Sequence, residues 1–194
     1  MTSWQPDAQE KMRQGFKCFN RVMLTLWRLG LGGWVNLWPS VVGRIMVVVH
    51  RGRKTGKRYQ TPVNYAIVDG ELYCVAGFGG ISDWYRNVVA HPEVEVWLPD
   101  GWWAGVAEEV TDAKIRLPLL RQVLINSGLA ARLAGLRPVT MSDETLRQAT
   151  ADYRLIHIRR TQARTGPGGP GELAWIWPLA TIVLLWRLIS RRRR

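Results

Sequence analysis

Short apolar runs separated by turn residues fill the centre of the chain, and this spacing is typical of β structure. The β-branched run over 44–50 predicts a buried strand, and segments 59–68 and 72–77 predict two more. Lys54-Thr55-Gly56-Lys57 separates the first two strands and Asp69-Gly70 separates the second from the third. Each turn provides a glycine where a hairpin needs a positive φ, so we expect three strands joined by hairpins.

A helix interrupts the strands after this point. Residues 83–90 follow Ser82, which is a suitable N-terminal cap, and stop before Pro92. The remaining expected elements are strands over 93–98, 102–110 and 154–159 and helices near 112–127 and 142–151. No strand leads through G-x-G-x-x-G into a helix, which excludes a dinucleotide-binding fold. The pattern favours an α+β fold in which short strands form a small barrel.

The N-terminal stretch, residues 1–35, predicts an amphipathic helix with a cationic face. Its apolar residues recur every three or four positions, at Phe16, Phe19, Met23, Leu26 and Trp27. Between them lie Arg13, Lys17, Arg21 and Arg28, and Gly30 ends the pattern. Such a helix either covers a core or lies on a lipid surface. The polar stretch Met1–Gln14 lacks the apolar region of a signal peptide.

The C-terminal stretch predicts a membrane anchor. A linker rich in glycine and proline over 161–172 precedes an apolar stretch, 173–190, that Arg187 interrupts. A membrane span needs about 20 apolar residues (range ~17–25), a length this stretch reaches if Arg187 extends toward the headgroups. We expect a single-pass anchor followed by a basic tail, 191–194; a helix packed on the domain or lying in the membrane plane is the alternative.

Composition narrows the classes of protein. The 194 residues carry a net charge of +12, concentrated in the C-terminal tail and in segment 51–58. Such clusters suit an anionic membrane, an anionic small molecule or nucleic acid. The two cysteines, Cys18 and Cys74, are too few for a disulfide framework. His50, His91 and His157 are scattered, so we expect no metal site.

Two motifs carry candidate chemistry. Gly52-Arg-Lys-Thr-Gly-Lys-Arg58 places cationic groups, a hydroxyl and backbone N–H groups on a turn, a set that suits a phosphate or polycarboxylate; the alternative is a solvated hairpin tip. Gly77-Phe-Gly-Gly80 leads into Asp83-Trp-Tyr-Arg-Asn87, where glycines would let the backbone approach a flat ligand and Trp84 and Asn87 would orient it. Trp84 packed in the core is the alternative there. No Ser-His-Asp arrangement or carboxylate pair is visible, so the reacting atoms of an enzyme would belong to a cofactor.

The order of these segments, GRKTGKRYQTPVNY, LYCVAGFGG and SDWYRNVVAHPEVEV, resembles the deazaflavin-dependent nitroreductase family of the split β-barrel, FMN-binding-like superfamily. The resemblance covers about residues 19–160, and two differences stand out: Arg58-Tyr59 replaces a proline-arginine pair, and the segment 81–83 before Trp84 is short. The resemblance implies coenzyme F420 as cofactor, with FMN as the alternative. Its phosphate and oligoglutamate tail would meet Arg53, Lys54, Thr55, Gly56, Lys57 and Arg58. Its ring would meet Thr61, Pro62, Val63, Ala76, Gly77, Phe78, Gly79, Gly80, Trp84 and Asn87.

The resemblance implies an oxidoreductase that transfers hydride from reduced F420 to a quinone or nitroaromatic acceptor, with Tyr153 as a candidate substrate contact. We expect a membrane-associated enzyme whose cofactor-binding barrel, 36–160, faces the cytoplasm. Other proteins of this fold are FMN-dependent reductases or non-catalytic flavin or haem carriers, and both stay open as alternatives. The fold is compatible with a homodimer, and the absence of a recognisable nucleic-acid-binding motif argues against a nucleic-acid partner.

Overall fold

The computed structural model describes residues 6–39 and 41–192. Its elements, in chain order, are α1 (Pro6–Arg28), α2 (Gly32–Val35), β1 (Ile45–Arg51), β2 (Arg58–Val68), β3 (Glu71–Ala76), η1 (Gly79–Ile81), α3 (Asp83–Ala90), β4 (Glu93–Leu98), β5 (Gly101–Glu109), α4 (Ala113–Ile125), α5 (Leu129–Leu133), α6 (Asp143–Ala149), β6 (Arg154–Ala163) and α7 (Ile176–Arg192). The predicted strands and the helix 83–90 are present, with ends within a few residues of the prediction.

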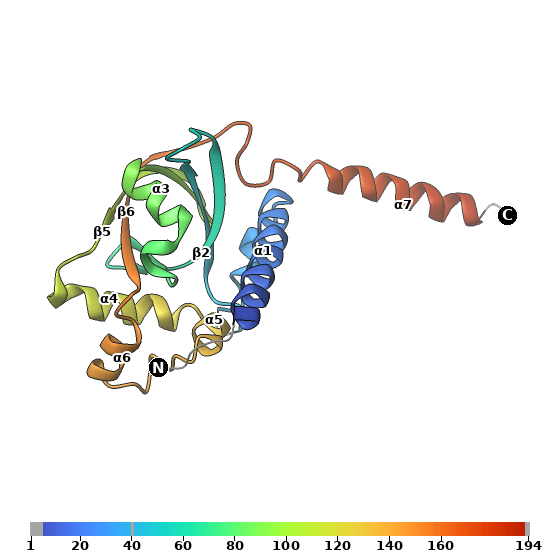
Figure 1. Ribbon diagram of the computed structural model, residues 1–194. Helices are drawn as coiled ribbons and strands as arrows, with labels where there is room; N and C mark the ends of the chain where they lie inside the picture. Colours follow the sequence, from blue (N-terminus) through green and yellow to red (C-terminus); the bar gives the residue numbers. More distant parts are fainter. Residues whose placement is uncertain (1–5, 40, 193–194) are drawn as a thin grey trace.

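The six strands form one closed antiparallel barrel (Figure 1), in which neighbouring strands follow the order β1-β2-β3-β6-β5-β4. Alternate residues of each strand point inward, as the β-branched run in β1 predicts, and fill the barrel with side chains such as Met46, Val48, Leu72, Val96 and Ile156. The prediction of an α+β fold with a β-barrel and flanking helices is confirmed. β6 runs to Ala163, beyond its predicted end, because β5 pairs with it through a bulge at Ala104/Gly105.

The turns follow the predicted chemistry. Asp69 and Gly70 have φ values of 52° and 83°, so both central residues of this hairpin adopt the left-handed conformation that suits the strand twist. Gly56 has a φ of 65° in the turn between β1 and β2. Asp112 and Ser142 cap α4 and α6 by accepting backbone hydrogen bonds. Ser82 precedes α3 but its side chain makes no capping bond, so that part of the prediction is wrong.

The N-terminal helix covers the outside of the barrel. Trp27 of α1 is 2% exposed and packs with Val47, Val49 and Trp97 on the outer face of β1 and β4. Of the two predicted roles, covering a core therefore holds for this end of the helix. The structure does not describe the side chains of residues 6–14, 16 and 17, and the predicted apolar position Phe16 is among them.

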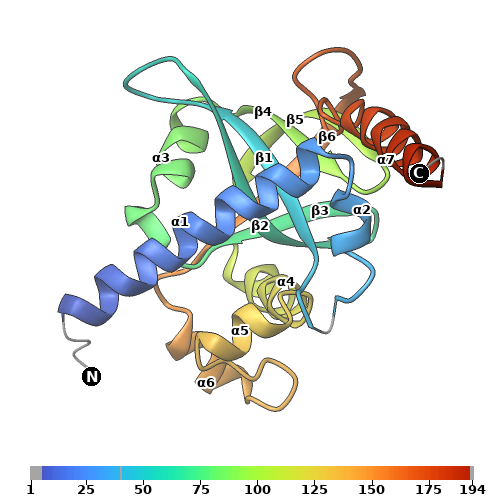
Figure 2. The same cartoon turned by 90° about the vertical axis from the view of Figure 1, so that its right-hand side faces the viewer.

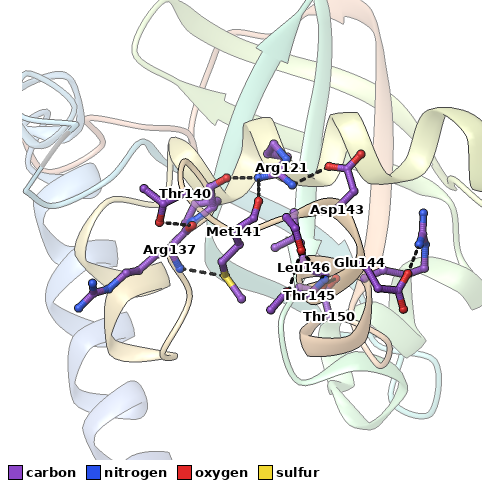
Figure 3. A network of polar contacts seen from close by, with 12 residues as sticks. Arg121, Arg137, Thr140, Met141, Asp143, Glu144, Thr145, Leu146 and Thr150 are labelled. Atoms are coloured by element: carbon purple, nitrogen blue, oxygen red, sulfur yellow. Dashed lines mark hydrogen bonds and ion pairs between the residues drawn. The ribbon is translucent and has the colours of Figure 1, made fainter.

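Three helices, α4, α5 and α6, pack together against the outer face of β2, β3 and β6, where they bury Ala66 and Leu155 (Figure 2). Figure 3 shows how Arg121 of α4 fastens the following loop: it donates to the carbonyl oxygens of Pro138 and Met141 and pairs with Asp143 at 2.7 Å. The sequence did not predict α5 or α2, because helices of five and four residues carry too few positions to show a period.

The C-terminal helix α7 extends away from the barrel (Figure 1). The first turn of α7 contacts the end of α1, where Trp177 Nε1 donates a hydrogen bond to the carbonyl oxygen of Leu29 at 2.9 Å. The helix starts at Ile176, three residues later than the predicted segment 173–190, and has 17 residues. Within residues 6–39 and 41–192, no helix combines the length and apolar character needed to cross a membrane. The predicted membrane span is therefore not supported. Arg193 and Arg194 of the basic tail lie outside the described residues.

Candidate functional site

The basic turn is fastened to helix α3 through Arg53. The backbone N–H and the Nη1–H of Arg53 both donate to Oδ1 of Asn87, at 3.1 and 2.9 Å, and its Nη2 pairs with Asp83 at 3.0 Å. The turn keeps its own shape through backbone bonds from Gly52 to Lys57 and from Gly56 to Gly52, both 2.8 Å. The predicted phosphate-binding turn and the predicted ring-binding helix therefore lie side by side.

The cations of the turn fall into two groups. Arg53 is occupied by α3, and Arg58 pairs with Glu95 at 2.5 Å and donates to the carbonyl oxygen of Gly168 at 3.2 Å. Lys54 and Lys57 are exposed, and within the described residues their ammonium groups have no ion-pair partner. The two lysines are therefore the cations of the turn that remain available to an anionic ligand.

Gly52 at the base of this turn makes room for two neighbouring side chains. A Cβ added to Gly52 would lie 2.5 Å from the ring of Tyr59 and 2.7 Å from Oγ1 of Thr55. The hydroxyl groups of Thr55 and Tyr59 are in turn 3.1 Å apart, within hydrogen-bond distance. Tyr59, at the start of β2, thus packs against Gly52 and Thr55 and holds the two ends of the turn together.

A buried histidine lies directly behind the turn. His50, near the end of β1, is 4% exposed, and its Nε2 lies 3.0 Å from Oγ1 of Thr61. Its Nδ1 lies 3.3 Å from Nδ2 of Asn87, so His50 joins β2 to α3. Burial lowers the pKa of His50 to about 4, because a charged imidazolium loses its hydration there. The ring is therefore neutral at pH 7.

The residues predicted to meet the cofactor ring divide by burial. Thr61 and Pro62 are half-buried on β2, whereas Val63 belongs to the barrel core and Ala76 is 1% exposed. Trp84 is half-buried and packs against the barrel core. This side chain therefore contributes to packing, as its alternative role predicts, and keeps part of its surface exposed.

The glycine turn lies against the segment that leads into β6. A Cβ on Gly79, whose φ is 57°, would come 2.1 Å from the carbonyl oxygen of Asp152, so only glycine fits. A Cβ on Gly80, in contrast, would meet no other atom within 4 Å. A Cβ on Gly77 would lie 3.8 Å from the ring of Tyr153, which places this candidate substrate contact beside the turn. Burial raises the pKa of Tyr153 above its usual value, so its phenol is protonated at neutral pH.

The other flank of α3 carries a hollow that the sequence did not predict. Val88, Val89, Pro92, Ala107, Glu108, Glu109 and Ile156 line it. At this flank Tyr85 donates a hydrogen bond to Glu109 at 2.5 Å. The residues predicted to bind the cofactor do not line this hollow, so α3 has two distinct sides.

A family model described as F420H(2)-dependent quinone reductase matches residues 25–129, more than half of the chain. The chain belongs to the F420H(2)-dependent quinone reductase family. It is therefore an F420-dependent oxidoreductase, and the predictions of an enzyme and of coenzyme F420 are confirmed. The matched range includes the basic turn, the glycine turn and α3, and it ends before Tyr153 and α7.

Solved structures also resemble the chain. A conserved hypothetical protein from Mycobacterium tuberculosis is 20% identical with a TM-score of 0.49; the match covers 69% of this chain and 80% of that one. A protein of unknown function from Agrobacterium tumefaciens is 20% identical with a TM-score of 0.45, over 72% and 59% of the two chains. An F420-H2 dependent reductase is 20% identical with a TM-score of 0.40, over 59% and 93%.

The neutral, buried His50 makes stability depend on pH. Because its pKa is about 4 in the folded chain and 6.5 in the unfolded chain, the unfolded state binds more protons between these values. Stability is thus lost as the pH falls from about 6.5 toward 4, by about 2 kcal/mol between pH 7 and 4.5. Denaturant unfolding at pH 7 and pH 4.5 measures the free energy of unfolding at each pH. Between these values His50→Gln should lose about 2 kcal/mol less stability than the wild type. An unchanged pH dependence in the variant would contradict the assignment.

Proposed function

We propose that the enzyme oxidises reduced coenzyme F420 with a quinone as acceptor. The observation that carries this proposal is that one family match spans both the basic turn and α3, which Arg53 and Asn87 join. An anionic cofactor tail needs cations, and a flat ring needs a backbone surface without side chains; both features lie next to each other here.

The residues present fit the cofactor. Lys54 and Lys57 are available at the tip of the turn, and Gly80 borders open space. We assign the phosphate and oligoglutamate tail to the turn 53–58, led by the two lysines. We assign the ring to Thr61, Pro62, the backbone of 76–80 and Trp84, with Val63 supporting it from the barrel core. Asn87, whose amide binds Arg53 and His50, holds the turn beside the ring site.

When bound, reduced F420 supplies a hydride, and a quinone that takes up this hydride and one proton becomes a hydroquinone. Tyr153 is the residue we assign to the acceptor. Its half-buried phenol keeps the proton on Oη at neutral pH and can donate a hydrogen bond to an acceptor oxygen beside Gly77. Nitroaromatics are the alternative acceptor class, because they accept a hydride from the same donor.

We also propose that the enzyme works at the surface of an anionic membrane. Apolar side chains surround α7, including Leu184 and Trp186, which are 66% and 68% exposed. A helix of 17 residues is about 25 Å long, shorter than the ~30 Å hydrocarbon core, so we place it along the interface. Arg187 and Arg191 would face the anionic headgroups of the cytoplasmic leaflet. Quinones dissolve in lipid, which makes this location suit the proposed acceptor.

The acceptor proposal predicts that purified enzyme oxidises F420H2 when a quinone is added. The rate of F420H2 oxidation is measured by the increase in the absorbance of oxidised F420. The assay is run with a quinone, with a nitroaromatic and with no added acceptor. Tyr153→Phe should lower the quinone rate about tenfold while F420 affinity stays unchanged, since the phenol contacts only the acceptor. No quinone-dependent oxidation by the wild-type enzyme would refute the acceptor proposal.

The tail assignment predicts that Lys54→Ala combined with Lys57→Ala weakens F420 binding by about tenfold or more, because two charge-assisted contacts are lost. Fluorescence titration with F420 measures the affinity. Lys114→Ala, an exposed lysine at the start of α4, is the matched control and should bind normally. Both lysines of the turn are exposed, so the melting temperature should stay within about 2 °C. Equal affinities in all three proteins would refute the assignment.

The membrane proposal predicts flotation of the full chain with vesicles that contain anionic lipid, and much less flotation with zwitterionic vesicles. Leu184→Asp combined with Trp186→Asp should abolish flotation, since two charges would enter the acyl region. Both positions are exposed, so the barrel should fold and bind F420 as before. The proposal would be contradicted if the chain floated equally with anionic and zwitterionic vesicles and the double variant floated like the wild type.

A further inference from the structure

The orientation of the Asn87 side chain is fixed by Arg53. Two donors of Arg53, the backbone N–H at 3.1 Å and the Nη1–H at 2.9 Å, point at the same atom of Asn87. Only the amide oxygen can accept hydrogen bonds, so this atom is Oδ1 and the amide nitrogen must face the other way. Asn87 is 6% exposed, which leaves no room for solvent to take over either contact.

The amide nitrogen of Asn87 faces Nδ1 of His50 at 3.3 Å. An amide nitrogen only donates, so Nδ1 must accept and carries no hydrogen. The buried ring is neutral at pH 7, because burial lowers its pKa to about 4. A neutral imidazole carries one hydrogen, which therefore sits on Nε2.

The Nε2–H of His50 points at Oγ1 of Thr61, 3.0 Å away. Thr61 Oγ1 accepts this bond, and its own hydrogen must turn to another acceptor. Among the described residues no acceptor for that hydrogen is recorded, and the Thr61 side chain is only half-buried. The hydroxyl is thus left as a donor that faces away from His50.

We propose that His50 is a positioning residue that makes Thr61 a hydrogen-bond donor to an acceptor atom of bound F420. The inference rests on the proposed function, in which Thr61 borders the cofactor ring. Every hydrogen bond in the row Arg53, Asn87, His50 and Thr61 then points in one direction, from the tail-binding turn toward the ring. Bonds aligned in this way polarise one another, so the hydroxyl of Thr61 is a stronger donor than an isolated threonine.

The row also defines specificity. A ligand that presents a carbonyl oxygen or an unprotonated ring nitrogen to Thr61 gives the hydroxyl hydrogen an acceptor and completes the row, whereas a ligand that presents an N–H or O–H leaves that hydrogen without an acceptor. Buried sites reject such mismatches, because a polar group remains without a partner. A structural histidine that merely fills the barrel end would not discriminate between these ligands.

The first experiment measures which ring nitrogen of His50 carries the hydrogen, in the full chain without cofactor. With ¹⁵N-labelled histidine, NMR distinguishes a protonated from an unprotonated ring nitrogen, and His50→Gln identifies the signals among the three histidines. We expect His50 to have its hydrogen on Nε2 from pH 5.5 to 8. A hydrogen on Nδ1, or on both nitrogens, overturns the inference. This result is independent of whether F420 binds.

The second experiment is a matched pair at position 61. Thr61→Val removes the hydroxyl and keeps the branched shape, and we expect it to weaken F420 binding about tenfold by fluorescence titration. Thr61→Ser keeps the hydroxyl and should stay within about threefold of the wild type. An equal loss in both variants, or none in Thr61→Val, overturns the inference. If the wild-type chain itself fails to bind F420, the proposed function fails instead, and the NMR result still stands.

Discussion

The contact between Asn87 and Arg53 is the interaction on which the site depends. The turn between β1 and β2 projects from the barrel, and Asn87 of α3 lies 34 residues after Arg53 in the chain. Because Oδ1 of Asn87 receives two hydrogen bonds from Arg53, the turn cannot move without α3. Asp83 adds an ion pair, but its side chain is 83% exposed, so the buried amide contributes more of the rigidity.

The barrel makes this contact possible. β1 and β2 pair from Ile45/Asn64 to Arg51/Arg58, so the turn is held by a continuous ladder. His50 and Thr61 point to the same side of that ladder as the core residues Val48 and Val63, and α3 covers them. A polar row at this point of an apolar barrel is costly unless each group finds a partner, and here the protein satisfies each group except the hydroxyl hydrogen of Thr61.

The sequence predicts local structure and local chemistry, because period, caps and turn residues act over a few positions. It therefore placed α3 correctly and put the cations on a hairpin turn. It could not show that Arg53 and Arg58 would find partners in Asp83 and Glu95, since those contacts depend on the barrel. The sequence does not show the role of His50, because its partners Thr61 and Asn87 reach it only through strand pairing and the packing of α3. Its position at the end of an apolar strand run, two residues after Val48, was the available signal.

The division between arginines and lysines in the turn follows from their chemistry. A planar guanidinium can hold two protein partners in fixed directions, as Arg58 does with Glu95 and Gly168 while it lies 5.9 Å from the ring centre of Trp102. An ammonium on a flexible stem instead suits a ligand whose anionic groups vary in position, as along a chain of carboxylates. The pair Arg58-Tyr59 therefore has a structural role: Arg58 fastens the turn to β4 and the linker, and the ring of Tyr59 packs against Gly52. Under the proposed function, this division leaves Lys54 and Lys57 for the anionic tail of the cofactor.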